Sequence, residues 1–167
     1  LWGTADMIFA ICDDENAVRE QLKQYLTRLS IGLDIDITYQ AFSSGEELLE
    51  KFNLSMEPFS VVFLDIEMTG HNGMEIAKEL RSKMDYRGKI VFITNYIGFM
   101  GDSFDVGASH YLIKPVDYKT FEEKMKIVIQ SFEAEDNYIL VDSLQGDSVL
   151  LYHKDILSIH PGKVGKG

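Results

Sequence analysis

Short apolar runs alternate with segments of helical spacing along most of the chain, and this alternation limits the folds open to it. Four of the runs are nearly continuous in apolar residues, as strands buried on both faces are, and one alternates apolar with polar residues. Strands that alternate with helices predict βαβ units, and therefore a doubly wound α/β fold around a parallel sheet. We expect five strands in that sheet, at residues 7–12, 35–39, 60–65, 89–94 and 110–113.

Helical spacing appears in the segments that follow these runs. Val18, Leu22, Leu26 and Leu29 recur at intervals of four, four and three residues, which places them on one helix face. A Ser-x-x-Glu pattern at residues 43–46 has the form of a capping box and predicts the start of a second helix. Three more helices are expected, from Met74 to Leu80, from Tyr96 to Val106, and after a capping Asp117 as far as Phe132.

The charge balance excludes several classes of protein. The chain has 167 residues, with 16 Lys and Arg against 27 Asp and Glu, a net charge of −11. Such an acidic chain is poorly suited to bind phosphate backbones or an anionic membrane surface. No apolar run approaches the roughly 18 residues of a transmembrane helix, and the single cysteine, Cys12, excludes an internal disulfide framework. We therefore expect a soluble, cytoplasmic protein without membrane contact.

Both ends of the chain depart from the alternating pattern. Residues 1–6 have no clear period and are interpreted as a remnant ahead of a natural start at Met7. Residues 133–137 are expected to form a polar linker, and residues 138–160 a β-hairpin with a possible third strand. A lone hairpin is marginal in water, so this short C-terminal β fragment is expected to be the truncated start of a second domain. Residues 161–167 are expected to be an unstructured tail.

Polar side chains stand at the ends of four expected strands. Ligands bind outside the carboxyl ends of parallel strands, so these groups should meet in one crevice. Carboxylates that lie together repel one another, and oxygen ligands without His or Cys favour Mg²⁺ as the ion that relieves the repulsion. A carboxylate beside Mg²⁺ can attack phosphorus, while nearby donors bind the phosphoryl oxygens. The carboxylates are Asp13, Asp14, Glu15 and Asp65, and the donors are Thr94 and Lys114.

Four short motifs stand at the ends of these strands: residues 11–15 (Ile-Cys-Asp-Asp-Glu), 62–68 (Val-Phe-Leu-Asp-Ile-Glu-Met), 92–94 (Phe-Ile-Thr) and 111–115 (Tyr-Leu-Ile-Lys-Pro). Together they resemble the motifs of the receiver domain of two-component response regulators. The resemblance covers residues 7–132 and implies a flavodoxin-like sheet with strand order 2-1-3-4-5. Two other proteins with related features fit less well. The acidic pair would repel the phosphate of a flavin mononucleotide, and it comes first in the chain rather than last, as a haloacid-dehalogenase-type phosphatase requires.

The resemblance implies roles for the acidic residues. Asp65 would be the phosphoacceptor. Asp13 and Asp14 would hold Mg²⁺ together with Asp65 and the backbone carbonyl of Glu67, with Asp14 the more direct ligand of the pair.

The resemblance also implies a switch. Lys114 would pair with the phosphoryl group, and the peptide bond between Lys114 and Pro115 would be cis. Thr94 and Tyr111 would form the switch pair, in which the hydroxyl moves to the phosphoryl group and the ring turns inward.

A second resemblance concerns the C-terminal β fragment. Residues 138–141 and 149–159 are similar to the opening strands of a LytTR-type DNA-binding domain. The two resemblances together imply a response regulator that is phosphorylated by a sensor histidine kinase, forms a homodimer when phosphorylated, and contacts DNA only through the rest of that domain. Such a protein is not an enzyme, since it assists only its own phosphorylation and dephosphorylation. The alternative is a stand-alone receiver that acts as a protein–protein interaction module.

Overall fold

A five-stranded parallel sheet forms the centre of the fold, with strand order β2-β1-β3-β4-β5. The computed structural model describes residues 7–54, 59–98, 101–136, 138–142 and 148–152. The α/β fold and the strand order are as the sequence predicts. The strands are β1 (Met7–Cys12), β2 (Ile37–Phe42), β3 (Val61–Leu64), β4 (Lys89–Thr94) and β5 (His110–Ile113).

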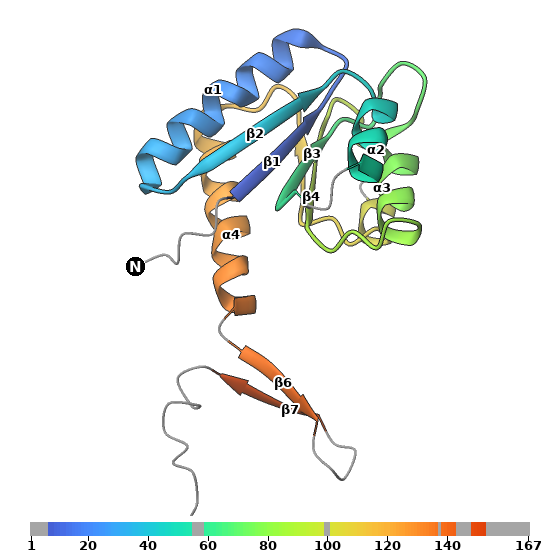
Figure 1. Cartoon of the computed structure of the whole chain (residues 1–167). Helices are drawn as coiled ribbons and strands as arrows, with labels where there is room; N and C mark the ends of the chain where they lie inside the picture. Colours follow the sequence, from blue (N-terminus) through green and yellow to red (C-terminus); the bar gives the residue numbers. More distant parts are fainter. Residues whose placement is uncertain (1–6, 55–58, 99–100, 137, 143–147, 153–167) are drawn as a thin grey trace, which may run out of the picture. The chain divides into compact units, whose positions relative to one another are not determined.

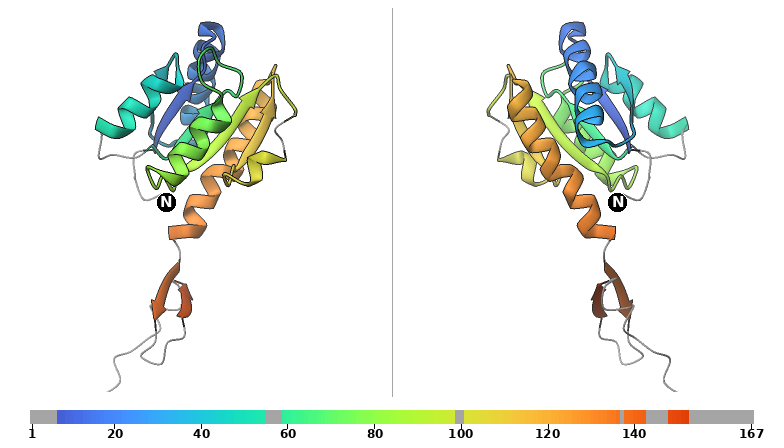
Figure 2. Two further views of the ribbon diagram at one scale, coloured as in Figure 1. Left: turned by 90° about the vertical axis from the view of Figure 1, so that its right-hand side faces the viewer. Right: turned by 90° about the vertical axis from the view of Figure 1, so that its left-hand side faces the viewer.

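Four α-helices accompany the sheet in the described part of the chain. Figures 1 and 2 show α1 and the first turns of α4 on one face of the sheet, and α2 and α3 on the other. None of the described helices is both long and apolar enough to cross a membrane. The helices are α1 (Asn16–Leu33), α2 (Gly45–Leu54), α3 (Gly73–Ser82) and α4 (Tyr118–Asp136).

Each face of the sheet carries its own layer of core side chains, because successive residues of a strand point to opposite faces. On the face with α1, the ring of Phe63 packs against Phe9 and Phe121, with centroid distances of 5.6 and 5.7 Å. On the face with α2 and α3, Val62 and Phe92 belong to a separate buried cluster. The two layers account for the nearly continuous apolar runs of the inner strands.

Two boundaries differ from the sequence-based expectation. Strand β2 covers residues 37–42 rather than 35–39, because α1 continues to Leu33 and ends at Asp34 in the left-handed conformation (φ 53°). The capping box lies one residue later than expected. Ser44 Oγ accepts a hydrogen bond from the Glu47 N–H at 3.2 Å, and Glu47 Oε2 accepts one from the Ser43 N–H at 2.8 Å.

The prediction of a helix from Tyr96 to Val106 is wrong. The described part of this segment contains only a short 3₁₀ turn, η1 (Asp102–Phe104), and residues 99–100 lie outside the description. Gly98 and Gly101 stand within four residues of each other, and glycine lowers helix stability by about 1 kcal/mol relative to alanine. The apolar residues of this stretch suggested a helix, but the sequence lacks the backbone preference to form one.

The chain divides into two compact units, residues 1–124 and 125–167, and their boundary falls within α4. Asp117 caps α4 as expected, since its Oδ1 accepts a hydrogen bond from the Thr120 N–H at 2.9 Å. The helix continues to Asp136, so residues 133–136 are helical rather than the expected linker.

The expected hairpin is present in the second unit. Strands β6 (Tyr138–Asp142) and β7 (Ser148–Tyr152) pair antiparallel. The expected third strand and the proposed terminal segments, residues 1–6 and 161–167, lie outside the described residues.

Gly73 permits a close approach between α3 and the end of β3. A Cβ atom at this position would lie 1.9 Å from the Asp65 carbonyl oxygen, which is backbone and cannot move aside. We expect Gly73→Ala to lower the free energy of unfolding by about 2 kcal/mol or more, measured by urea unfolding. The control is Gly32→Ala in α1, where a Cβ meets nothing within 4 Å and stability should stay equal or rise. Equal stability of Gly73→Ala and the parent would contradict this packing argument.

Candidate functional site

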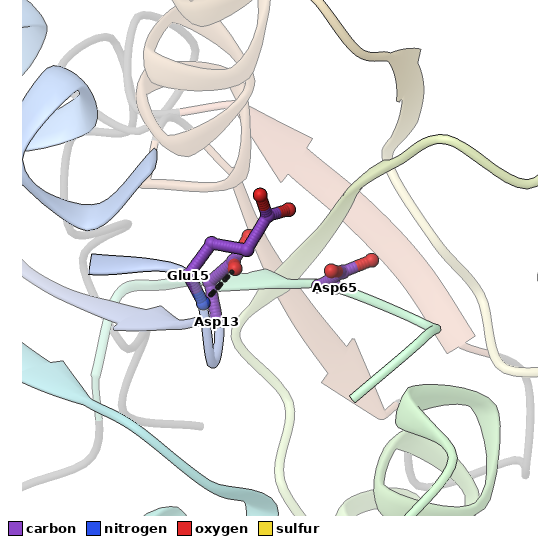
Figure 3. A group of neighbouring side chains, drawn as sticks. All are labelled: Asp13, Glu15 and Asp65. Atoms are coloured by element: carbon purple, nitrogen blue, oxygen red, sulfur yellow. Dashed lines mark hydrogen bonds between the residues drawn. The ribbon is translucent and has the colours of Figure 1, made fainter. Parts of the chain in front are cut away.

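The carboxyl ends of three strands bring charged side chains together at one edge of the sheet. Asp13 follows β1, Asp65 follows β3 and Lys114 follows β5. Figure 3 shows the carboxylates of Asp13, Glu15 and Asp65 in this region. The three carboxylates have one oxygen each within 4.8 Å of the others. The strand ends therefore meet in one site, as the sequence predicts.

Lys114 is the cation of this site. Its Nζ lies 2.8 Å from Asp13 Oδ2, 2.9 Å from Asp65 Oδ2 and 2.9 Å from Glu15 Oε1. The Lys114 side chain is 8% exposed, and Asp13 and Asp65 are 2% and 3% exposed. The peptide bond between Lys114 and Pro115 is cis, as the resemblance implied.

Burial and charge pull the pKa values of this group in opposite directions. Burial raises the pKa of Asp13, and the hydrogen bond from Lys114 only partly offsets it. For Lys114, burial alone would lower the pKa, but hydrogen bonds to Asp13, Asp65 and Glu15 outweigh it and hold the pKa above its ordinary value. Lys114 is therefore a permanent positive charge at neutral pH, whereas burial disfavours the charged form of the Asp13 carboxylate.

Hydrogen bonds among nearby residues stabilise the turn after β1. The Glu15 N–H donates to Asp13 Oδ1 at 2.9 Å, the contact drawn in Figure 3. The Arg19 guanidinium donates to the Asp13 carbonyl oxygen at 2.7 Å and to Asn16 Oδ1 at 3.1 Å. These bonds fix the Asp13 carboxylate toward the crevice. Neither Arg19 nor the ion pair of Glu15 was predicted from the sequence.

The Asp14 side chain contacts the loop after β3. Its Oδ2 accepts hydrogen bonds from the Thr69 N–H at 2.9 Å and from Thr69 Oγ1 at 3.0 Å. The Thr69 N–H contributes most to lowering the pKa of Asp14. Asp14 is not among the carboxylates that meet within 4.8 Å in the described residues, whereas Glu15 is. The contact between Asp14 and Thr69 was not predicted from the sequence.

The loop after β3 holds the second buried carboxylate. The Glu67 N–H donates to Asp65 Oδ1 at 3.2 Å, and Glu67 and Asn72 form an isolated antiparallel bridge. Asn72 then caps α3, since its Oδ1 accepts from the Met74 N–H at 2.8 Å. Asp65 thus has one oxygen on a backbone N–H and the other on Lys114.

Thr94 and Tyr111 are linked through the backbone of Tyr96. Thr94 is fully buried, and its Oγ1 accepts a hydrogen bond from the Tyr96 N–H at 3.3 Å. The Tyr111 hydroxyl donates to the Tyr96 carbonyl oxygen, and its ring packs against Phe92 with a centroid distance of 5.8 Å. Burial and the nearby charge of Asp65 raise the pKa of Tyr111. Tyr96 is a member of this network that the sequence did not identify.

The carboxylates of the site fit a hard divalent cation. Their ligand atoms are all oxygen, and no His or Cys belongs to the described cluster. The Lys114 ammonium lies among the same oxygens and offsets their charge. Asp13 and Asp65 could ligate a cation directly, and Asp14, whose Oδ2 accepts from Thr69, could offer its other oxygen.

The sequence matches the description "Response regulator receiver domain" over residues 9–140. The chain belongs to the response regulator receiver domain family. The sensory transduction protein LytT of Bacillus subtilis (strain 168) is 32% identical over 116 residues, which cover 70% of this chain and 45% of LytT. LytR of Staphylococcus epidermidis is 29% identical over 127 residues, covering 76% of this chain and 48% of LytR. The chain thus spans about half the length of these relatives.

A solved structure of a receiver supports the same relationship. The response regulator TrrA from Thermotoga maritima, in complex with Mg(2+)-BeF, is 31% identical, with a TM-score of 0.61 over 73% of this chain and 98% of that chain. The relationship to LytT and LytR agrees with the LytTR-type resemblance drawn from the sequence.

Replacing Asp13 with Asn should raise the free energy of unfolding near pH 7. Because burial raises the pKa of Asp13, the folded state binds its proton more tightly than the unfolded state, so stability from this group is lost as the pH rises through the raised pKa. A neutral Asn removes that loss, so the gain is present near pH 7 and shrinks toward about pH 4, where the carboxyl group becomes protonated in the unfolded chain as well. Urea unfolding at both pH values measures the difference. Asp36→Asn removes the same charge from an exposed residue and should change little; a destabilised Asp13→Asn near pH 7 would contradict the argument.

The thiol of Cys12, directly before Asp13, should be unreactive in the folded chain. Burial, reinforced by the negative charge of Asp13, raises its pKa to about 12, and the thiol donates to the Ser44 carbonyl oxygen at 3.3 Å. We expect negligible reaction with 5,5′-dithiobis(2-nitrobenzoic acid) near pH 8 in buffer and complete reaction of this single cysteine in urea. Rapid labelling of the folded protein would mean that the end of β1 opens readily.

Proposed function

We propose that this receiver accepts a phosphoryl group on Asp65 from a sensor histidine kinase and changes conformation in response. The observation that carries the proposal is the contact of 2.9 Å between Lys114 Nζ and Asp65 Oδ2, in a site that also contains Asp13. This arrangement supplies a nucleophile, a permanent cation and additional carboxylates at one point. The relationship to LytT and LytR supports the same function.

Asp65 is suited to act as the nucleophile. Its Oδ1 accepts from the Glu67 N–H, which fixes the plane of the carboxylate, and its Oδ2 accepts from Lys114. In the proposed transfer, one carboxylate oxygen of Asp65 attacks the phosphorus of a phosphohistidine. The phosphorus–nitrogen bond breaks, and its electron pair returns to the imidazole, which takes a proton from solvent. The product is an acyl phosphate on Asp65.

Lys114 changes its partner in this scheme without leaving the site. An ammonium has three N–H donors, so Lys114 can bind a phosphoryl oxygen and still keep a carboxylate partner. Its contact with Glu15 shows that the ammonium already reaches toward the exposed side of the crevice. We infer that Lys114 stabilises the charge on the transferred group.

We also infer that Mg²⁺ is the cofactor of this site. The carboxylates of Asp13 and Asp65 would hold it, with Asp14 and the backbone carbonyl of Glu67 as further ligands. When bound, Mg²⁺ would offset the negative charge that gathers on the phosphoryl oxygens. The all-oxygen donor set supports this assignment, as does the Mg(2+)-BeF complex of the relative TrrA.

A groove beside Lys114 gives a phosphodonor room to approach. Its volume is about 220 Å³, and its lining includes Glu15, Gln21, Asn95, Lys114 and Pro115. Because Lys114 and Glu15 belong both to the groove and to the charged cluster, a donor bound there would lie next to the reacting carboxylate.

Thr94 and Tyr111 are the proposed switch. The Thr94 hydroxyl has a hydrogen to donate while its oxygen accepts from Tyr96, so it can turn toward a new phosphoryl oxygen. The Tyr96 backbone contacts both members of the pair, and movement of Thr94 would therefore disturb the Tyr111 hydroxyl. Phosphorylation of Asp65 would in this way alter the surface near β5.

The remaining assignments extend the same proposal. The protein would be a phosphoacceptor and not an enzyme with a separate substrate, and it would act in the cytoplasm. Phosphorylation would favour a homodimer, and output would come from DNA binding by a LytTR-type domain that begins in the β6–β7 hairpin. In the alternative, a stand-alone receiver works as a protein interaction module.

Incubation with acetyl phosphate tests the phosphoacceptor directly. With Mg²⁺ present, we expect the full chain to gain one phosphoryl group by intact mass, and Asp65→Asn to gain none. Asp36→Asn, which loses the same charge at an exposed position, should be phosphorylated like the parent. Equal modification of the parent and Asp65→Asn would mean another acceptor. No modification of the folded parent would favour the interaction module.

A further inference from the structure

Three carboxylates of the described residues occupy the three N–H groups of the Lys114 ammonium. An ammonium carries three N–H donors and no acceptor. Three carboxylate oxygens lie within hydrogen-bonding distance of Lys114 Nζ, from Asp13 at 2.8 Å, Asp65 at 2.9 Å and Glu15 at 2.9 Å. A phosphoryl oxygen that pairs with Lys114 must therefore take the place of one of these carboxylates.

The Glu15 carboxylate is the partner of Lys114 that costs least to replace. The side chains of Asp13 and Asp65 are almost fully buried, whereas that of Glu15 is 56% exposed. A buried carboxylate that loses its ammonium partner has no water to compensate its charge, so its release is costly. An exposed carboxylate is hydrated again as soon as it turns away, and such pairs contribute little net free energy.

Glu15 also stands where a phosphodonor would arrive. Of the residues that line the groove of about 220 Å³ beside Lys114 in the described part of the chain, only Glu15 and Lys114 carry a charge. The Glu15 backbone is fixed, since its N–H donates to Asp13 Oδ1 at 2.9 Å and its carbonyl oxygen accepts from the Val18 N–H at 3.1 Å. The Glu15 side chain can therefore leave Lys114 without disturbing the turn after β1 (Figure 3).

We propose that Glu15 competes with the incoming phosphoryl group for the third N–H of Lys114, and thereby slows phosphorylation of Asp65. This inference rests on the proposed function, in which Lys114 binds a phosphoryl oxygen. In the unphosphorylated chain, the pair of Glu15 and Lys114 occupies the position that the phosphoryl oxygen needs. A phosphoryl group, or a tetrahedral anion of the same shape, binds when the Glu15 carboxylate turns into solvent.

Two other roles for Glu15 predict different results. A bound cation could take the Asp13 oxygen from Lys114, which would free an N–H while Glu15 keeps its contact. Neutralising Glu15 would then leave anion binding unchanged. Glu15 could instead act as a ligand of the cation, and its neutralisation would then weaken binding of an anion that needs the cation. Only competition predicts that anion binding becomes tighter when Glu15 is neutralised.

The decisive measurement is the dissociation constant for beryllofluoride, a stand-in for the phosphoryl group. It is determined on the full chain by calorimetric titration, at a MgCl₂ concentration that saturates each protein. Glu15→Gln keeps the length of the side chain and removes its charge, and we expect about two- to fivefold tighter binding, the range for one exposed ion pair. The rate of phosphorylation by low concentrations of acetyl phosphate, followed by intact mass, should rise by a similar factor.

The matched control is Glu20→Gln. It removes the same charge from another exposed ion pair, in which Glu20 contacts Lys23 within α1. The net charge of the chain changes equally in the two variants, but Glu20 has no contact with Lys114. Glu20→Gln should therefore bind beryllofluoride and react with acetyl phosphate like the parent.

A salt series separates the ion pair from a change in the fold. Salt screens exposed charges, and the screening length falls to about 3 Å at 1 M. The difference in beryllofluoride affinity between Glu15→Gln and the parent should therefore shrink as NaCl approaches that concentration. A loosened site would instead weaken binding by Glu15→Gln at every salt concentration.

The results distinguish the role of Glu15 from the proposed function itself. Equal or weaker binding by Glu15→Gln, with normal binding by the parent, would overturn the competition and leave the proposed function standing. If neither protein bound beryllofluoride or reacted with acetyl phosphate, both proposals would fail. Tighter binding and faster phosphorylation of Glu15→Gln, with Glu20→Gln unchanged, would support both.

Discussion

The ion pairs of Lys114 with Asp13 and Asp65 are the interaction on which the site depends. Two almost fully buried carboxylates at neighbouring strand ends would repel each other strongly, and the single ammonium between them makes their burial tolerable. The pairs can form only because β1, β3 and β5 are parallel and end at the same edge of the sheet. Gly73 also contributes to the position of Asp65, because the absence of a Cβ atom lets α3 lie against the Asp65 backbone.

Much of the fold could be predicted because its strongest signals are local. A run such as residues 60–65 is apolar at every position before Asp65 except Ser60, which is the pattern of a strand buried between two helix layers. The apolar runs predict where the strands end. The polar residues at those ends, Asp13, Asp65 and Lys114, are then predicted to lie in the site. The Asp117 cap was predictable for the same reason, since it bonds to a residue three positions away.

The errors have physical causes of two kinds. Backbone preference was misjudged where apolar content suggested a helix over residues 96–106 and where α1 ran further than its apolar face. Partners distant in the chain were missed because no local pattern encodes them. Asp14 and Thr69 are 55 residues apart, and Lys114 and Glu15 are 99 residues apart. The residue types in the site were predictable, but which oxygen bonds to which donor depended on tertiary packing.

The two acidic neighbours at the end of β1 are thus in different electrostatic states. Asp13 is buried beside Lys114 with a raised pKa, while Asp14 is partly exposed with a pKa lowered by Thr69. The site therefore has one carboxylate that gains from an added cation and another that already has satisfied hydrogen bonds. Because the β3–α3 loop supplies the Glu67 N–H to Asp65 and the Thr69 N–H to Asp14, a single short segment of backbone connects Asp14 to the proposed phosphoacceptor.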